Sequence, residues 1–365
     1  MHMLRSFLSS AAILAVAVTV SAQTGARSAA QQSPPRLSPE ARSEAIRRAQ
    51  VWKATDVPSM DLRAGPQGPG AFQPNETVTC TYVDKEMTGK SPKFTCALKP
   101  DDEVKVKYGQ DNGEVYGEVA ATRLLWALGF GADHMYPVRV VCRGCSPDPQ
   151  RDKKGRSGEV VFDFAAIERK MPGHTLETKE DSGWGWPDLD LVDEASGGAP
   201  RAQRDALKLL AVFLQHTDNK PAQQRLICLT HLEEGTPCRE PFMMLNDLGL
   251  TFGKANAFNR NAPGSVNFEK WSQTPVWKDA KGCVGNLSKS MTGTLGDPVI
   301  GEPGRKFVAD LLVQLSDAQL HDLFDVARFP LRLLDGGEPK RVTVEEWVNA
   351  FKHKRDEVVT RTCAP

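Results

Sequence analysis

Two aspartates of this chain follow closely on apolar segments. Asp218 stands in the polar run 216–220, behind the apolar residues 209–214, and Asp247 comes just after the apolar run 242–245. An acid placed just past a buried segment is held rigidly at the edge of a core. Two such acids with a lysine upstream form the smallest set of side chains for metal-assisted phosphoryl transfer.

A lysine and a glutamate extend this set. Phosphoryl transfer requires charge neutralisation and positioning more than covalent chemistry, so a lysine has to contact phosphate oxygens and a glutamate has to fix the lysine. Lys107 lies on a predicted strand with Lys105 as the competing choice, and Glu118 lies on a predicted helix with Glu114 as its competitor. A single lysine or glutamate at such a position is more often a solvated surface side chain. The hypothesis of a phosphoryl-transfer site therefore depends on the order of the lysine, the glutamate and the two aspartates along the chain.

The two aspartates have different expected roles. Asp218 would orient an acceptor hydroxyl or bind a metal. Asp247, which precedes Leu248 and Gly249, would ligate Mg²⁺ or Mn²⁺ bridging phosphates, because hard cations favour carboxylates. The competing interpretation is that both aspartates simply make turns.

Alternating β-branched residues and one helical pattern organise the first half of the chain. The predicted order is strand, strand, strand, helix, strand, strand, at residues 77–83, 93–98, 104–108, 114–128, 136–142 and 158–167. This pattern predicts an antiparallel sheet with one helix.

The second half is predicted to be mainly helical. Helical patterns cover residues 202–215, 307–315, 316–328 and 344–360. The last helix has Thr343 as its cap and Glu346 at the capping-box position. Loops 178–200 and 253–300 carry tryptophans that either line a carbohydrate or peptide groove or pin the loops to the core: Trp184, Trp186, Trp271 and Trp277.

The order of lysine, glutamate, aspartate and aspartate, in a β-rich half followed by a helical half, resembles the atypical protein-kinase-like superfamily. Its members include the phosphoinositide kinases, the HipA-type toxin kinases, and the secretory-pathway and spore-coat kinases. The resemblance covers about residues 76–330. It implies an α+β, two-lobed fold, with an antiparallel β-sheet N-lobe carrying one helix and a mainly helical C-lobe. It also implies ATP and Mg or Mn as cofactors.

The resemblance assigns roles residue by residue. The strand lysine of the superfamily corresponds to Lys107, and the glutamate of its Glu-x-x-Ala pattern corresponds to Glu118. The catalytic-loop aspartate corresponds to Asp218, and the metal-binding aspartate of its Asp-x-Gly pattern corresponds to Asp247.

Further residues complete the expected site. Glu168, in a hinge segment, and Lys220, beside Asp218, are expected to contact the nucleotide. Gln223 stands where many members carry a metal-binding Asn, and its amide oxygen can coordinate with a reach that differs by one methylene. Between the first two strands, Gly89 is the only candidate for a phosphate-binding glycine. These departures leave a pseudokinase-like protein as the alternative.

Eight cysteines indicate disulfide bonds. An even number is typical of exported, disulfide-bonded chains, although the number of pairings is on the order of 100. Local spacing favours Cys80 with Cys96, Cys142 with Cys145, and Cys228 with Cys238, which leaves Cys283 with Cys363. Zinc is the rival interpretation, but a single C-x-x-C without a partner pair at finger spacing gives it little support.

Length and charge set the broad limits. The chain has 365 residues and no net charge, which suggests one large domain or two lobes and gives no indication of nucleic acid or an anionic membrane. A positive start, a short apolar segment and a small-residue cleavage site predict a signal peptide, with no membrane span after its removal. The expected organisation is a signal peptide (1–22), a disordered linker (23–45), a helix and loop extension (46–75), a β-rich N-lobe (76–173) and a helical C-lobe (174–365).

We therefore expect an exported protein, periplasmic or secreted, that transfers a phosphoryl or nucleotidyl group from ATP to a hydroxyl of a protein or glycan, using a metal ion. The alternative is a catalytically inactive exported protein that recognises a peptide or glycan. The motifs G-x-S-x-G and H-E-x-x-H do not occur in the sequence, so a serine hydrolase and a zinc peptidase are not supported.

Overall fold

The computed structural model describes residues 36–152, 158–179, 181–232, 236–253, 265–279, 281–332 and 342–363. The expected signal peptide lies outside these residues. Helix α1 (Pro39–Arg47) begins inside the range expected to be a linker, which is therefore too long at its C-terminal end. The Ser38 hydroxyl accepts a hydrogen bond from the Ala41 amide, and Pro39 fits the first helical position, so the helix starts there.

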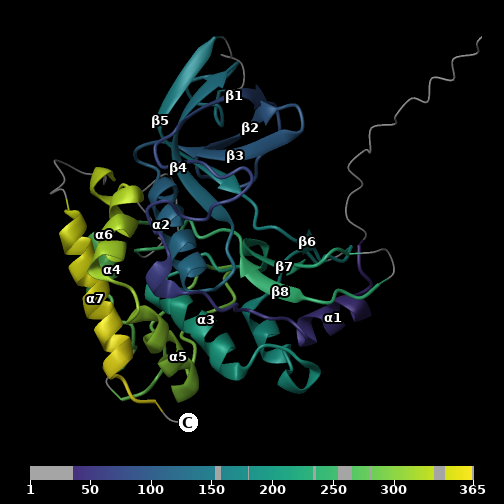
Figure 1. Ribbon diagram of the computed structural model, residues 1–365, viewed down its shortest axis with the longest axis vertical. Coiled ribbons are helices and arrows are strands. Elements are labelled where there is room, and N and C mark those ends of the chain that lie inside the picture. The colour runs from purple at the N-terminus through teal and green to yellow at the C-terminus, as the bar shows by residue number, and fades with distance from the viewer. Residues whose placement is uncertain are drawn as a thin grey trace, which may run out of the picture. The chain divides into compact units, whose positions relative to one another are not determined.

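Five strands close into a barrel in the order β1-β2-β3-β5-β4 (Figure 1). They are β1 (Thr77–Val83), β2 (Lys93–Lys99), β3 (Asp102–Tyr108), β4 (His134–Arg143) and β5 (Glu159–Arg169). The prediction of a purely antiparallel sheet is wrong in one pairing, because β1 and β4 run parallel. This pairing closes the sheet and leaves neither strand as a free edge.

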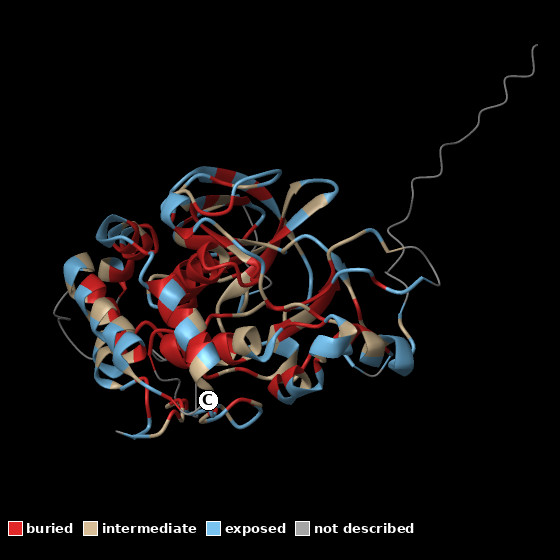
Figure 2. Cartoon of the chain, turned by 60° about the horizontal axis from the view of Figure 1, so that its bottom comes forward, coloured by how far each residue is buried: buried red, intermediate tan, exposed pale blue. Residues whose placement is uncertain are grey.

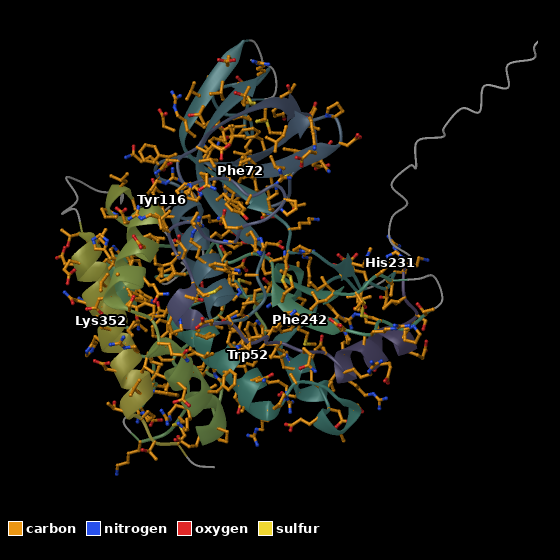
Figure 3. The ribbon with its side chains drawn as sticks, in the orientation of Figure 1. Trp52, Phe72, Tyr116, His231, Phe242 and Lys352 are labelled. Carbon is orange, nitrogen blue, oxygen red and sulfur yellow. A yellow bond between two sulfur atoms is a disulfide. The ribbon has the colours of Figure 1, made fainter. Side chains whose placement is uncertain are left out.

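The barrel has its own apolar core. Phe94 packs against Tyr108 and Phe162, with ring centroids 5.6 and 5.2 Å away. Phe72, labelled in Figure 3, contacts Tyr136 edge to face with centroids 5.7 Å apart. Because side chains alternate along a strand, the inward Tyr108 places the preceding residue of β3 on the opposite face.

Helix α2 (Glu114–Ala127) packs against β4 and against α6 (Asp317–Val326). Every residue of α2 except Trp126 is buried. The helix ends before Gly129, whose φ is +85° and where a Cβ would lie 2.1 Å from the Lys53 carbonyl oxygen. Glycine suits this position because it tolerates the positive φ and because it has no Cβ to collide with Lys53.

A second sheet was not predicted. It consists of β6 (His174–Thr175), β7 (Gln224–Cys228) and β8 (Pro241–Leu245), all antiparallel. All five residues of β8 are buried, so the strand shows no alternation of apolar and polar residues. Such an uninterrupted apolar run does not distinguish a strand from a buried helix.

Three further helices lie in segments predicted to be helical: α3 (Arg201–Leu214), α5 (Glu302–Leu312) and α7 (Val344–Thr360). The prediction is wrong for α4 (Phe268–Gln273), which lies within the segment 253–300 expected to be a loop, because its 6 residues are too few to show a helical apolar pattern. Short 3₁₀ turns lie at η1 (Val57–Ser59), η2 (Trp186–Leu191), η3 (Glu194–Ser196), η4 (Pro221–Gln223) and η5 (Phe329–Leu331). The α+β class is confirmed, and α7 has the predicted capping box between Thr343 and Glu346.

The loop tryptophans belong to the core. Their exposed fractions are 3% or less, so the groove interpretation is wrong for this set: Trp184, Trp186, Trp271 and Trp277. Trp271 donates its indole N–H to the Phe213 carbonyl, and Trp277 donates to the Glu357 carbonyl. Buried residues gather in the barrel interior and between the helices, as Figure 2 shows.

Four disulfides confirm the pairing favoured by spacing. They join Cys80 to Cys96, Cys142 to Cys145, Cys228 to Cys238, and Cys283 to Cys363. Three of these sulfurs lie close together in the barrel, but disulfide sulfurs are not thiolate ligands for a metal. In the described part of the chain, none of the helices has the length and apolar character needed to cross a bilayer.

Candidate active site

Lys107 is the centre of a buried ionic cluster. Its ammonium Nζ lies 2.7 Å from Glu114 Oε2, 2.8 Å from Glu118 Oε2 and 3.6 Å from Asp247 Oδ1. The Lys107 side chain is fully buried. Three of the four side chains expected from the sequence therefore meet, and Glu114 joins Glu118 rather than competing with it.

Three elements bring these groups together. Strand β3 turns Lys107 away from the barrel core, and α2 places Glu114 and Glu118 one turn apart on the same face. Asp247 follows the buried end of β8 after one residue. A Cβ at Gly249 would lie 2.7 Å from the Glu114 carboxylate carbon, so the small residue of the Asp-x-Gly segment leaves room for Glu114.

The cluster has more negative than positive groups. Burial raises the pKa of Glu118 well above its usual value, with Lys107 opposing and Asp247 adding to the effect. Burial alone would raise the pKa of Asp247, but Lys107 and Lys105 outweigh it and hold that pKa below its usual range. The pKa of Lys107 lies well above its usual value, because Asp247, Glu114 and Glu118 outweigh the effect of burial.

Lys105 forms a separate pair. It lies opposite Glu168 in the β3–β5 register and makes an ion pair with it. This geometry distinguishes the two lysines of β3, since Lys107 is the one that directly contacts the carboxylate cluster. Glu168 was expected to contact the nucleotide, and in this structure its carboxylate faces Lys105; the nucleotide contact stays a prediction.

Asp218 is held by three side chains. Its Oδ2 lies 2.9 Å from Lys220 Nζ and accepts a hydrogen bond of 3.0 Å from Gln223 Nε2. Its Oδ1 accepts a hydrogen bond of 3.2 Å from the Ser290 hydroxyl. The sequence prediction named Lys220 and Gln223 but missed Ser290, because nothing local marks a contact across 72 positions.

Gln223 connects the two aspartates. Its side chain donates to Asp218, and its carbonyl oxygen accepts hydrogen bonds of 2.9 Å from the Asn246 amide and 3.4 Å from the Asp247 amide. The Asp218 loop and the Asp247 loop are therefore joined through one residue. The amide nitrogen of Gln223 faces Asp218, and its expected role as a metal ligand would use the oxygen of the same group.

Asn219 and His216 hold the loop from inside. Asn219 Oδ1 accepts hydrogen bonds of 2.9 Å from the amides of Thr294 and Leu295, and its Nδ2 donates to the His216 carbonyl. Burial lowers the pKa of His216 to about 4, with the charges of Asp247 and Asp218 opposing this shift. These two residues fix the loop that carries Asp218, and the sequence marks them only as parts of a polar run.

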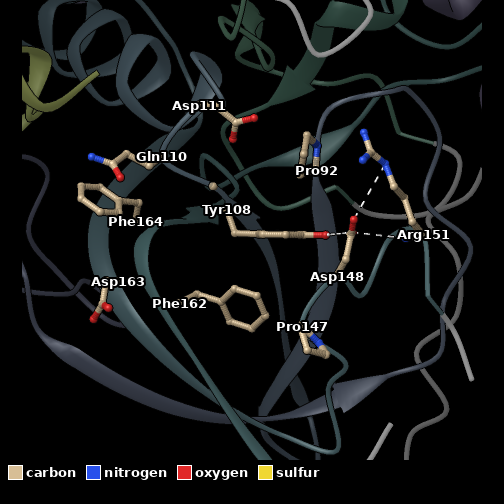
Figure 4. Close-up of a pocket in the computed structure, with 11 residues that line it drawn as sticks. Pro92, Tyr108, Gln110, Asp111, Pro147, Asp148, Arg151, Phe162, Asp163 and Phe164 are labelled. Atoms are coloured by element: carbon tan, nitrogen blue, oxygen red, sulfur yellow. Dashed lines mark hydrogen bonds and ion pairs between the residues drawn. The ribbon is translucent and has the colours of Figure 1, made fainter. Parts of the chain in front are cut away.

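A pocket of about 400 Å³ lies on the other face of β3 (Figure 4). Tyr108 and Phe162 form part of its wall, and the Tyr108 hydroxyl donates a 2.5 Å hydrogen bond to Asp148. Burial and this hydrogen bond raise the pKa of Tyr108. In the described part of the chain, the predicted site residues do not line this pocket, so it is separate from the ionic cluster.

The chain shows a loose likeness to the Helicobacter pylori proinflammatory kinase CtkA. The crystal structure of that kinase matches with a TM-score of 0.42 and 10% sequence identity, over 79% of this chain and 98% of that chain. No protein-family model and no curated protein matches the chain. The candidate site is defined by the geometry of its own side chains.

Proposed function

We propose that this protein is an exported, kinase-like transferase that uses ATP and Mg²⁺ or Mn²⁺ to modify a hydroxyl of a protein or glycan. The observation that carries the proposal is the cluster in which three carboxylates surround the ammonium of Lys107. In this proposal residues 76–173 and 174–365 are the two lobes, and the nucleotide binds between them.

The donor set fits a hard divalent cation. Carboxylate oxygens are the ligands that Mg²⁺ and Mn²⁺ prefer, and three carboxylates gather within 3.6 Å of the Lys107 ammonium. We assign Asp247 as the principal ligand and Gln223 as a second ligand. When bound, the metal would neutralise phosphate charge.

The other residues have roles that follow from their positions. Lys107, fixed by Glu118, would bind phosphate oxygens, while Glu168 and Lys220 would help to hold the nucleotide. Asp218, oriented by Gln223, would accept the proton of the acceptor hydroxyl. The acceptor oxygen would form the new bond to the transferred phosphorus. ADP would leave when the γ-phosphoryl group is transferred, and pyrophosphate would leave when the nucleotidyl group is transferred.

Export is part of the proposal. Four disulfides are compatible with an oxidising compartment, where such bonds form and persist. The predicted signal peptide would supply the route to the periplasm or the exterior.

Labelled ATP tests the reaction. The purified protein is incubated with Mn²⁺ and either γ-labelled or α-labelled ATP, together with protein and glycan acceptors. Label from the γ position indicates phosphoryl transfer, and label from the α position indicates nucleotidyl transfer. Asp247→Asn should lower the transfer rate by at least about 100-fold, as expected for loss of a charge-stabilising group.

Asp310→Asn is the matched control, because Asp310 forms an exposed pair with Lys306. Equal transfer rates in Asp247→Asn and in wild type would contradict the assignment. If the protein binds nucleotide but transfers no label, either to an added acceptor or to itself, the result would favour the alternative of a catalytically inactive binding protein. The three partners that already engage Asp218 are the observation behind that second candidate.

A further inference from the structure

A second pocket lies beside the Asp218 loop, at the C-terminal end of α3. Its volume is about 270 Å³, and Thr217 is part of its wall. The polar lining consists of three amide and three hydroxyl side chains: Gln215, Gln273, Asn286, Thr217, Thr274 and Ser288. Among the described lining residues there is no charged side chain.

Two buried polar atoms of this lining have no hydrogen-bond partner in the described structure. They are Gln215 Oε1 and Thr217 Oγ1, on residues that are only 4% and 3% exposed. A buried polar group without a partner costs about 1–3 kcal/mol, so a ligand that supplies partners would gain from both atoms. Neither atom is open to solvent, so a ligand in the pocket would pair with them after each side chain turns toward it.

Gln215 occupies an unusual backbone position. It caps α3 with φ +55°, a left-handed conformation in which glycine is the common residue. A glycine would relieve this conformation but would remove the side chain from the pocket wall. Gln215 at this position therefore provides a side-chain amide to the pocket wall.

The pocket is structurally connected to Asp218. The Ser290 amide donates a 2.8 Å hydrogen bond to the Thr217 carbonyl, and the Ser290 hydroxyl donates to Asp218. Residues Asn286 and Ser288, two positions apart on the same segment, line the pocket. One short segment thus forms a pocket wall and positions the Asp218 carboxylate.

We propose that this pocket binds one neutral sugar unit of a carbohydrate. Each sugar hydroxyl both donates and accepts, so it can satisfy the Gln215 acceptor and the Thr217 hydroxyl. Pro275 and Leu287 add apolar surface for the C–H face of a sugar ring. The pocket has the volume of roughly nine water molecules at about 30 Å³ each, enough for a monosaccharide.

The absence of charge in the described lining disfavours anionic and cationic ligands, because a buried charge requires a partner. That the sugar carries the acceptor hydroxyl rests on the proposed function. Sugar binding itself needs neither nucleotide nor metal, so it can be tested independently of that function.

Saturation-transfer NMR on the full chain, without nucleotide, tests the proposal. The probes are D-glucose, D-galactose, D-mannose and N-acetyl-D-glucosamine, each offered singly at millimolar concentration. At least one sugar should receive saturation from the protein. Thr217→Val should weaken its binding about tenfold, the loss expected for one hydrogen bond to a buried group.

Ser288→Arg gives a second, folding-independent check. Ser288 is exposed at the pocket, so a long charged side chain there should abolish sugar binding and leave the melting temperature unchanged. Ser59→Arg is the matched control on an exposed turn elsewhere, and it should bind as wild type does.

Three results would overturn the pocket assignment. These are no saturation of any sugar, unchanged binding in Ser288→Arg, or binding of N-acetylalanine methylamide in place of sugars. Sugar binding in a protein that fails to bind ATP would instead support the pocket and count against the proposed transferase.

Discussion

Lys107 balances a site that would otherwise hold only buried negative charge. Replacing it by methionine leaves Glu114, Glu118 and Asp247 without their common ammonium partner. Breaking a buried ion pair on one side typically costs about 3–5 kcal/mol, so the free energy of unfolding of Lys107→Met should fall by about that amount at neutral pH. Urea denaturation measures this loss.

The loss in Lys107→Met should shrink as the pH is lowered. Without Lys107, the carboxylates take up protons more readily in the folded chain than in the unfolded chain, and protonation removes the repulsion. Lys306→Met is the control, because its exposed pair with Asp310 should contribute less than about 1 kcal/mol. Equal losses in the two variants would show that Lys107 is not the charge centre.

His216 should remain neutral far below the usual pH of histidine titration. Burial lowers its pKa to about 4. Between about pH 6.5 and 4 the unfolded chain therefore binds a proton that the folded chain does not, and stability should fall as the pH drops through this window.

NMR of the chain with ¹³C-labelled histidine checks this value directly. The resonance that disappears in His216→Gln identifies the residue, and it should keep its neutral chemical shift until about pH 4. A midpoint near the ordinary value of about 6.5 would contradict the buried, neutral imidazole.

Helix α7 depends on a cap that can be read from the sequence. The Thr343 hydroxyl accepts a hydrogen bond from the Glu346 amide, and the Glu346 carboxylate accepts one from the Thr343 amide. Thr343→Ala should lower the free energy of unfolding by about 1 kcal/mol, measured by chemical denaturation. Thr360→Ala, at the other end of α7, removes only a bond to the Asp356 carbonyl and should have the smaller effect. The reverse order would refute the capping role.

The Cys283–Cys363 disulfide closes the longest loop of the four, with a sequence separation of 80, against 10 for Cys228–Cys238. Loop-closure entropy predicts a stabilisation of about 4–5 kcal/mol for the former and about 3 kcal/mol for the latter. Paired Cys→Ala variants, compared by denaturation under oxidising conditions, should show this order. A larger loss for the Cys228–Cys238 pair would contradict it.

Elements with a local signal could be predicted from the sequence, and those that depend on distant partners could not. The capping box of α7, the alternation in β3 and the helical pattern of α2 each lie within one short segment. The parallel pairing of β1 with β4 depends on a register between segments far apart in the chain, which composition does not encode.

The same distinction holds across the whole site. Lys107, Glu118 and Asp247 were selected by their order in the chain, and the fold brings them into one cluster. The sequence could not show that Glu114 also joins them. Whether Glu114, Glu118 or both reach Lys107 depends on the tilt of α2. The sequence also could not predict the hydrogen bond from the Ser290 hydroxyl to Asp218, since the two residues are 72 positions apart.

The central claim for the whole molecule is that Asp247 and Lys107 form a metal–nucleotide site. A thermal-shift measurement with Mn²⁺ and ATP tests it most directly, on wild type, Asp247→Asn and the surface control Asp310→Asn. Nucleotide at about 100 times its dissociation constant adds about 2.7 kcal/mol to the folded state, so the melting temperature of wild type and of the control should rise by several degrees. Asp247→Asn should show little or no rise. No rise in wild type, or an equal rise in Asp247→Asn, would contradict the account.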